Sequence, residues 1–221
     1  MNRAASPRRT LPHFGACLDS VVGGADILRY FPAVADGPPI PDTPIQLQGC
    51  LLLADPSLRD GTFDHSVILL ADHSPADGAF GLILNHPTER VVGDFLTDKD
   101  FGSLRGIPVH DGGPVGREHL TFSAFWWNKK SGLRWAIRIS AEDAIKHSHR
   151  PGRIVRAFVG HSGWSPGQLE GELRRASWIT TRPAPELLGA DHDRSLWYGI
   201  LRHLSPFHRV LAEAPANPLL N

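Results

Sequence analysis

The amino-acid sequence predicts a mixed α+β protein in which strands outnumber helices. Several apolar runs have the length of strands rather than helices, and they do not alternate regularly with long helical segments. That pattern disfavours a doubly wound parallel sheet and favours an α+β body. The chain has 221 residues, of which 41% are hydrophobic and 21% charged, so one substantial globular domain with a real core is expected.

The chain is expected to have two parts. Residues 1–44 would be an N-terminal extension with a proline-rich connector, and residues 45–221 would form one α+β domain. Within the extension, residues 1–16 are expected to be a loose basic arm, and the apolar spacing of residues 17–31 predicts a short helix packed on the body. The range Phe31–Pro44 contains five prolines and few apolar anchors, which predicts an irregular connector.

Three apolar runs at the start of the domain predict buried strands. They are GCLLLA (49–54), SVILLA (66–71) and AFGLILN (79–85). The polar loop DHSPADG joins the last two runs, so we expect an antiparallel hairpin there. Further strands are predicted at 107–110, 119–126, 132–139, 153–159 and 177–181.

Fewer segments predict helices. Val91–Leu96 fits one or two helical turns. Ser140 followed by Glu142 and Asp143 indicates a helix start, because acidic side chains suit the positive N-terminal end of a helix. A last helix is expected from Asp193, after which apolar residues recur on one helical face. These residues are Leu196, Trp197, Ile200, Leu201 and Leu204.

Charge and composition exclude several classes of protein. Lys+Arg and Asp+Glu both number 23, so the chain has no overall field that would attract nucleic acid. Cys17 and Cys50 have no metal-type spacing and are too few for a disulfide scaffold. No apolar stretch approaches the roughly 18 residues of a membrane helix, and no apolar segment of a signal peptide follows the basic N-terminus. We therefore expect a soluble, reduced, cytoplasmic protein without membrane contact.

The segment Gly163–Gly167 matches G-x-S-x-G, the pattern of a hydrolase nucleophile elbow. In that elbow the backbone N–H after the serine stabilises the oxyanion, and here Pro166 follows Ser165 and has no N–H. The loss of one such donor costs an acyl-transfer enzyme about 100- to 1,000-fold in rate. The pattern is therefore expected to mark a helix start instead of a nucleophile.

The helix-start interpretation accounts for the neighbouring residues as well. Ser165 would be the N-cap, Pro166 the first helical residue, and Gln168 the third, which completes a capping box. Trp164 would then pack on Leu169 as a hydrophobic staple. Glu170 and Arg174 would form an i,i+4 pair on the exposed face.

Two further polar turns follow apolar strands. In HDGGPVG (110–116), Gly112 and Gly113 can expose backbone N–H groups as an anion-binding nest, although a tight turn with Pro114 fixing its exit explains the same residues. Asn85 ends a strand and can either face a pocket or bond its own backbone before Pro87.

No sequence pattern indicates a metal or a cofactor. His147-x-His149 and Asp191-His192-Asp193 contain ligand residue types, but neither has the spacing of a metal motif. H-E-x-x-H, paired C-x-x-C and the glycine-rich phosphate motifs do not occur. We therefore expect neither a bound metal nor a cofactor.

The motifs together resemble a known family. In order they are GCLLLADPSL, SVILL, GAFGLILNHP, DGGPV, GHSGWSPGQLEGEL and SLWYGIL, and they span about residues 45–205. This succession is similar to the bacterial YqgE/AlgH family, whose members are often described as transcriptional regulators. The resemblance implies a single domain whose bent, largely antiparallel sheet forms a partly barrel-like body flanked by a few helices. It implies no established enzymatic activity, catalytic residue or cofactor.

The leading functional hypothesis is a non-enzymatic regulatory protein that acts indirectly through an unknown protein or small-molecule partner. Direct sequence-specific DNA binding is disfavoured, since the chain has no helix-turn-helix signature, no zinc finger and no net positive charge. We expect its binding surface where three polar loops converge at one end of the sheet. The candidate ligand-binding residues are Asn85, Gly112, Gly113, Pro114, Gly163, Trp164, Ser165 and Gln168.

Two alternatives remain open at this point. One is a hydrolase or transferase that uses Ser165 with His161 or His110 as its base. The other is nucleic-acid binding through the basic arm, whose cations are Arg3, Arg8 and Arg9.

Overall fold

The computed structural model describes residues 46–96, 99–189 and 191–213, all of which belong to the unit Pro44–Asn221. The predicted basic arm, the helix at 17–31 and the proline-rich connector lie outside the described residues.

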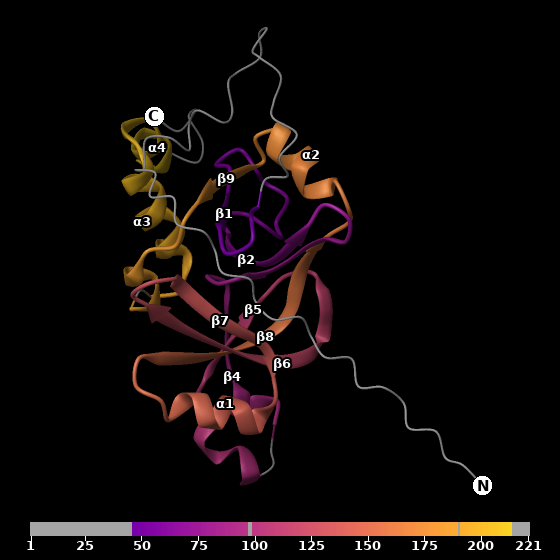
Figure 1. Cartoon of the computed structure of the whole chain (residues 1–221), viewed down its shortest axis with the longest axis vertical. Helices are drawn as coiled ribbons and strands as arrows, with labels where there is room; N and C mark the ends of the chain where they lie inside the picture. The colour runs from indigo at the N-terminus through magenta and orange to yellow at the C-terminus, as the bar shows by residue number, and fades with distance from the viewer. Residues whose placement is uncertain (1–45, 97–98, 190, 214–221) are drawn as a thin grey trace, which may run out of the picture. The chain divides into compact units, whose positions relative to one another are not determined.

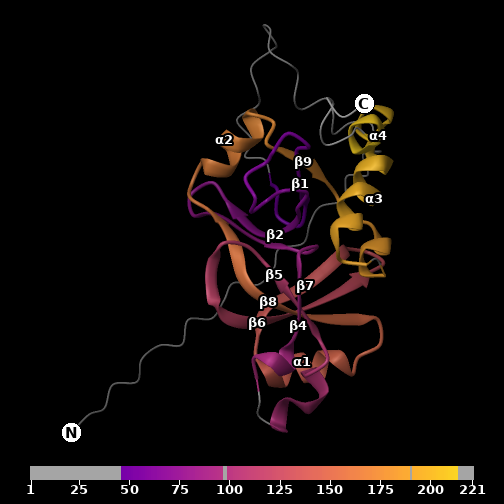
Figure 2. The same ribbon diagram turned by 180° about the vertical axis from the view of Figure 1, so that it is seen from behind.

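The body combines one large sheet with short helices (Figures 1 and 2). The strands are β1 (Leu51–Ala54), β2 (Val67–Ser74), β3 (Gly78–Ile83), β4 (Pro87–Val91), β5 (Pro108–Asp111), β6 (Val115–Asn128), β7 (Gly132–Ile139), β8 (Arg153–Trp164) and β9 (Trp178–Thr181). The helices are α1 (Ala141–Ser148), α2 (Gln168–Arg174), α3 (Arg194–Leu204) and α4 (Pro206–Glu213). Short 3₁₀ segments are η2 (Val92–Asp94), η3 (Lys99–Leu104) and η4 (Pro185–Leu188).

The strands form a single sheet with the order β4-β5-β8-β3-β2-β1-β9, and β6 joins it through β8 and carries β7. Every pairing is antiparallel except that of β5 with β8. The long strand β8 organises the sheet, because its first part pairs with β5 and β6 and its last residues pair with β3. The sheet curls into a half-barrel, which confirms the predicted α+β fold with a bent, largely antiparallel sheet.

The continuous apolar runs are explained by burial on both faces of the sheet. Side chains alternate along a strand, so Leu51 and Leu53 join the core cluster that contains Trp197 of α3. Leu52 points the other way, into a cluster that contains Leu169 of α2. A strand covered on both faces has no solvent side, and its sequence therefore shows no polar alternation.

The helices cover different parts of the sheet. In Figure 1, α3 and α4 lie along one side, while α2 lies beside β9 at one end and α1 at the other end. Ser140 caps α1 by accepting a hydrogen bond from the backbone N–H of Asp143 at 3.1 Å, as predicted. Trp197 anchors α3 by donating its indole N–H to the carbonyl of Ala54 at 2.9 Å. In the part of the chain that the structure describes, no helix has the length and apolar character needed to cross a membrane.

Some elements differ from the sequence-based prediction. The strand predicted to end at residue 159 continues to Trp164, because β8 exchanges partners near Gly160 and then pairs with β3. The predicted turn before Pro87 passes directly into β4, which pairs with β5. Helix α4, beginning at Pro206, was not predicted.

Candidate functional site

A pocket of about 370 Å³ opens among β3, β6, β7 and β8. Its volume lies within the range of small-molecule sites. The residues that line it are Phe80, Leu82, Gly116, His119, Thr121, Arg138, Gly160 and His161.

Arg138 reaches this pocket from a strained backbone position. Phe122 pairs with Ile139 and Ala124 with Ala136, so β7 has one extra residue opposite Ser123. Such a bulge re-aims a side chain. Arg138 has a φ of +54°, in the left-handed region, which costs a non-glycine residue about 1 kcal/mol or more. Its guanidinium carbon lies 4.5 Å from the centroid of the Phe80 ring.

His161 packs beside Phe80 and Arg138 on one side of the pocket. Its ring centroid lies 4.9 Å from that of Phe80. The Nη2 atom of Arg138 lies 3.4 Å from Nδ1 and 3.5 Å from Nε2 of His161. Because the two distances are nearly equal, the guanidinium lies over the face of the ring and is not aligned with the lone pair of one nitrogen. Burial and the positive charge of Arg138 lower the pKa of His161, so its imidazole is neutral at pH 7. Arg138 forms no ion pair with a carboxylate of the described residues.

The predicted Gly112–Gly113 turn supports the pocket from behind. The N–H of Gly112 donates to the carbonyl of Val159 at 2.8 Å, and that of Gly113 donates to Oδ1 of Asp111 at 3.1 Å. Because both groups are bonded, neither is free to form the anion-binding nest considered above. A Cβ atom at Gly113 would lie 2.5 Å from Oγ of Ser162 and would also overlap the backbone of His161. The glycine pair thus allows close contact with β8, and Pro114 beside it is exposed.

Asn85 is a structural clamp. Its side chain is fully buried, and Oδ1 accepts from the N–H of Val67 at 2.7 Å while Nδ2 donates to the carbonyl of His65 at 2.9 Å. Both hydrogen bonds join Asn85 to the segment that leads into β2. Asn85 does not line the pocket.

The segment at 163–168 departs from the predicted helix start. Gln168 donates its N–H to the carbonyl of Ser165 at 3.0 Å, which closes a turn, and α2 begins only at Gln168. Ser165 is therefore not the N-cap. Gly167 occupies that position with a φ of +76°, which no helical residue adopts, and so the helix cannot begin earlier. One half of the capping box is present, because Oε1 of Gln168 accepts the N–H of Ser165 at 3.1 Å.

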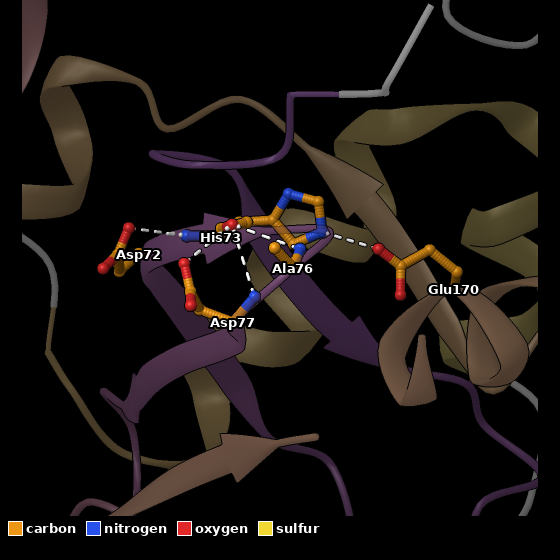
Figure 3. A network of polar contacts seen from close by, with 6 residues as sticks. Asp72, His73, Ala76, Asp77 and Glu170 are labelled. Atoms are coloured by element: carbon orange, nitrogen blue, oxygen red, sulfur yellow. Dashed lines mark hydrogen bonds and ion pairs between the residues drawn. The ribbon is translucent and has the colours of Figure 1, made fainter. Parts of the chain in front are cut away.

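The structure confirms the predicted contact of Trp164 with the Leu169 side of α2, but it does not show the predicted ion pair of Glu170 with Arg174. Trp164 and Leu169 are both buried in one core cluster, as expected. Glu170 instead contacts His73 of β2, with 3.0 Å between Oε1 and Nε2, as Figure 3 shows. His73 was not singled out from the sequence, since it lies in the polar segment that follows an apolar run and nothing in that segment indicates which helix will face it.

The three predicted loops do not meet at one end of the sheet. Asn85 lies two residues after Ile83, the last residue of β3, whereas Gly163 pairs with Phe80 near the start of that strand. Five residues of extended chain separate Phe80 from Asn85, which corresponds to roughly 16 Å. The Gly112–Gly113 turn lies between them, since the N–H of Asp111 donates to the carbonyl of His86 at 2.8 Å and a Cβ atom at Gly113 would lie 2.5 Å from Oγ of Ser162. The three loops therefore follow one another along the sheet and do not meet at one point. A ligand-binding role for the individual residues stays a prediction.

Among the described residues, no hydrogen bond joins the Ser165 hydroxyl to either candidate base. His161 is stacked on Phe80, and His110 is 4% exposed within β5. A hydrogen-bonded pair of Ser165 with one of these two histidines, which the alternative hydrolase would use, is therefore not formed in the described part of the chain. Arg3, Arg8 and Arg9 of the other alternative lie outside the described residues.

A second group of polar side chains, which the sequence did not reveal, is buried where β5 and β8 face the start of α3. The imidazoles of His110 and His192 have ring centroids 6.5 Å apart. Burial lowers the pKa of each to about 4, with a further contribution from Arg156 of β8. No group of three histidine, cysteine, aspartate or glutamate side chains among the described residues is arranged to hold a metal.

Comparison with known proteins places the chain in a family. The sequence model described as AlgH-like matches residues 51–207. A UPF0301 protein of Cereibacter sphaeroides is 35% identical over 174 residues, which are 72% of this chain and 92% of that protein. A UPF0301 protein of Streptomyces coelicolor is 33% identical over 187 residues, which are 79% of this chain and 95% of that protein.

Solved structures show the same fold. The solution structure of the AlgH protein from Pseudomonas aeruginosa matches with a TM-score of 0.55 at 24% identity, covering 79% of this chain and 97% of that one. A crystal structure from Corynebacterium diphtheriae matches with a TM-score of 0.57 at 20% identity, covering 76% and 92% of the two chains. The family model covers most of the body, and the half-barrel sheet agrees with the solved structures. The chain therefore belongs to the AlgH-like family.

Proposed function

We propose that this protein is a non-enzymatic ligand-binding protein that regulates gene expression indirectly, through a contact with another protein. Its ligand site is the pocket among β3, β6, β7 and β8. The observation that carries the proposal is Arg138, a cation held over Phe80 and His161 by a strained bulge and without a carboxylate partner among the described residues. Backbone strain persists where the surrounding structure enforces it, and such positions cluster at ligand sites.

The lining favours a small anion that also has an apolar or planar part. Arg138 supplies the positive charge, and its planar guanidinium suits a carboxylate or phosphate group. Phe80 and Leu82 offer apolar surface for the rest of the molecule. Thr121 adds a hydroxyl, which donates to the carbonyl of Phe158 at 3.4 Å.

The chemistry of the pocket supports binding rather than catalysis. Its single hydroxyl is already bonded to the backbone, and its histidine His161 stacks instead of facing a nucleophile. A ligand carboxylate beside Arg138 would offset the charge that lowers the pKa of His161, so that binding would be accompanied by proton uptake. Affinity is therefore expected to increase between pH 8 and pH 6.

A binding screen with a matched variant tests the ligand site. Aromatic carboxylates and organic phosphates would be screened against the full chain by thermal shift, and hits would be measured by calorimetry. Because a hydrogen bond to a charged group contributes about 1.5–3 kcal/mol, Arg138→Gln should weaken a hit about 10- to 100-fold. Arg59→Gln, an exposed arginine outside the pocket, should leave the affinity unchanged. Equal affinity of the Arg138→Gln variant and the wild type would refute the site.

The regulatory part of the proposal needs a separate measurement. In the organism that encodes the protein, Arg138→Gln should reproduce the transcript changes caused by deleting the gene, while Arg59→Gln should not. A deletion that leaves the transcript profile unchanged would contradict regulation without bearing on ligand binding.

A further inference from the structure

Positive charge is concentrated in one part of a chain that is neutral overall. Between His119 and Leu169 the sequence has eight Lys and Arg residues and two carboxylates, Glu142 and Asp143, whereas each kind numbers 23 in the whole chain. This stretch forms β7, α1, β8 and most of β6. Asp143 is already paired with Lys146, with 2.9 Å between Oδ1 and Nζ. The stretch therefore produces a local positive field that the overall composition conceals.

Strand pairing places two of these cations on either side of Trp126. Trp126 of β6 is paired with Arg134 of β7 and with Arg153 of β8, so the three side chains form a row on the same face of the sheet. The guanidinium carbon of Arg153 lies 4.2 Å from the centroid of the Trp126 ring, and its Nη1 donates to Nδ1 of His147 at 2.7 Å. These two contacts hold Arg153 on the indole.

Exposed cations on the two adjoining turns extend this row. Lys129 and Lys130 lie in the turn from β6 to β7, where Oδ1 of Asn128 accepts the N–H of Lys130 at 2.8 Å. Arg150 lies in the turn from α1 to β8, and its carbonyl accepts the N–H of Arg153 at 3.2 Å. We call five cations the basic face: Lys129, Lys130, Arg134, Arg150 and Arg153. None of them lines the ligand pocket.

One edge of β7 has no strand partner in the part of the chain that the structure describes, because β7 pairs only with β6. The strand has 8 residues, and Leu133 and Trp135 anchor it in the core cluster that contains Trp197. A strand edge of this kind presents N–H and C=O groups with which another extended chain can pair. The core thus holds β7 in place as a preformed edge for strand addition, next to the basic face.

The charge beside this edge determines which kind of chain fits it. A second copy of the protein, paired through its own β7, would bring two basic faces together, and like charges across paired strands are destabilising. Single-stranded nucleic acid matches the charge but has no peptide groups to pair with the edge, and Arg153 already covers a face of the Trp126 ring on which a base would stack. An extended peptide segment with carboxylates has both the charge and the backbone groups that this surface binds.

We propose that the β7 edge and the basic face together bind an acidic extended segment of a partner protein, which adds to the sheet as a strand next to β7. The inference rests on the proposed function, because it identifies the surface for the protein contact through which regulation would act. The backbone of β7 supplies hydrogen bonds, while Arg134, Lys129 and Lys130 select carboxylate side chains. Trp126 and Arg153 lie at the centre of the surface, and both residue types are enriched among the side chains that dominate protein interfaces.

Fluorescence anisotropy with the full chain at low salt tests this surface. Three labelled probes would be compared: a peptide of alternating Glu and Thr about as long as β7, the matching Lys–Thr peptide, and a uridine oligonucleotide with the charge of the acidic peptide. The Glu–Thr peptide should bind at least about tenfold more tightly than either other probe, and added salt should weaken it. Absence of binding, or binding no tighter than that of the oligonucleotide, would overturn the proposal.

Charge variants locate the binding. Lys129→Gln combined with Lys130→Gln should weaken the Glu–Thr peptide about 3- to 10-fold, since exposed ion pairs are individually weak. The matched control combines Arg174→Gln with Arg175→Gln, which removes two exposed cations at the end of α2 and should leave the affinity unchanged. Equal weakening in the two double variants would mean that only the net charge of the protein matters, and it would refute this surface.

Hydrogen exchange decides whether the peptide adds as a strand. A saturating amount of the Glu–Thr peptide should slow the exchange of backbone N–H groups within Gly132–Ile139. Those of β9, which lies at the other end of the strand order, should exchange as before. Binding without added protection in β7 would exclude strand addition and contradict the proposal.

The result is separable from that of the proposed function. If the protein binds the acidic peptide at β7 but its deletion leaves the transcript profile unchanged, this surface is supported and the regulatory role is contradicted. If the deletion changes the transcript profile but the β7 edge binds no acidic peptide, this surface is overturned and the regulatory role stands.

Discussion

At the scale of single residues, close backbone contacts determine where glycine is required. Gly113 and Gly160 approach each other where the turn after β5 meets β8, and a Cβ atom at either would overlap the opposite backbone. Gly113 has a φ of +140° and Gly160 a φ of +71°, so both also need a conformation that other residues rarely adopt. Gly163 belongs to the same strand but has open space around it.

Gly113→Ala should therefore be strongly destabilising. The overlap with His161 and the positive φ together predict a loss of about 2–4 kcal/mol in the free energy of unfolding. Urea unfolding followed by tryptophan fluorescence would measure it. Gly163→Ala is the control, and it should change the free energy by less than about 0.5 kcal/mol. Similar losses in the two variants would show that the contact with β8 is not what restricts Gly113.

Asn85 shows what sequence can and cannot establish about one residue. Its position at the end of an apolar strand predicted a special role, and two interpretations were open. The structure shows neither arrangement, because a side-chain amide at 0% exposure bonds to Val67 and His65 and so stabilises the chain entering β2. Local sequence contains no information on a partner that is 18 or 20 residues away.

At the scale of elements, the carboxylate of Glu172 ties α2 to the two tryptophans that flank it in sequence. Oε2 of Glu172 accepts the indole N–H groups of Trp164 and Trp178, each at 2.8 Å, and Oε1 accepts from Gln168 at 2.9 Å. The helix has 7 residues, too few to be stable alone, so these bonds and the burial of Leu169 maintain it.

Removing this carboxylate should loosen α2. Glu172→Ala leaves two indole N–H groups without an acceptor, and we expect a loss of about 2–4 kcal/mol in unfolding free energy. Glu172→Gln keeps one acceptor oxygen and should lose less. Hydrogen exchange should show faster opening of α2 in Glu172→Ala than in the control Glu186→Ala, whose side chain is exposed. Unchanged exchange would mean that packing alone holds the helix.

The elements themselves were largely predictable. The runs that contain Leu52 and Ile68 form buried strands, and Ser140 begins a helix, because these depend on local composition and spacing. The start of α2 was misplaced, since the positive φ of Gly167 depends on how the turn fits between β8 and the helix. The bulge at Arg138 was not predicted either, because it arises from the pairing of β7 with β6.

At the scale of the whole molecule, burial of histidines makes stability depend on pH. His110 and His192 have pKa values of about 4 in the folded protein, below the 6.5 expected when unfolded. A lowered pKa means that the unfolded chain binds protons more readily. Stability is therefore complete above about pH 6.5 and decreases as the pH falls toward 4.

The size of this decrease can be measured. Each buried imidazole is expected to remove up to about 3 kcal/mol at pH 4, relative to pH 7. Unfolding free energies between pH 4 and 7.5 would record the slope, and His110→Gln should reduce it by about half. His119→Gln alters an exposed ring and should leave the slope unchanged. A flat profile across this range would contradict the burial of both imidazoles.

Sequence alone determined the family, the α+β class and most of the strands, because these follow from local apolar runs and from the order of the motifs. Only the tertiary structure decided where a functional site can lie. The antiparallel register of β3 and β8 separates Asn85 from Gly163, and the pairing of β8 with β6 brings Arg153 beside Trp126. Both outcomes depend on which residues of distant strands are paired, and pairing is set by the packing of the whole sheet rather than by the residues near each position.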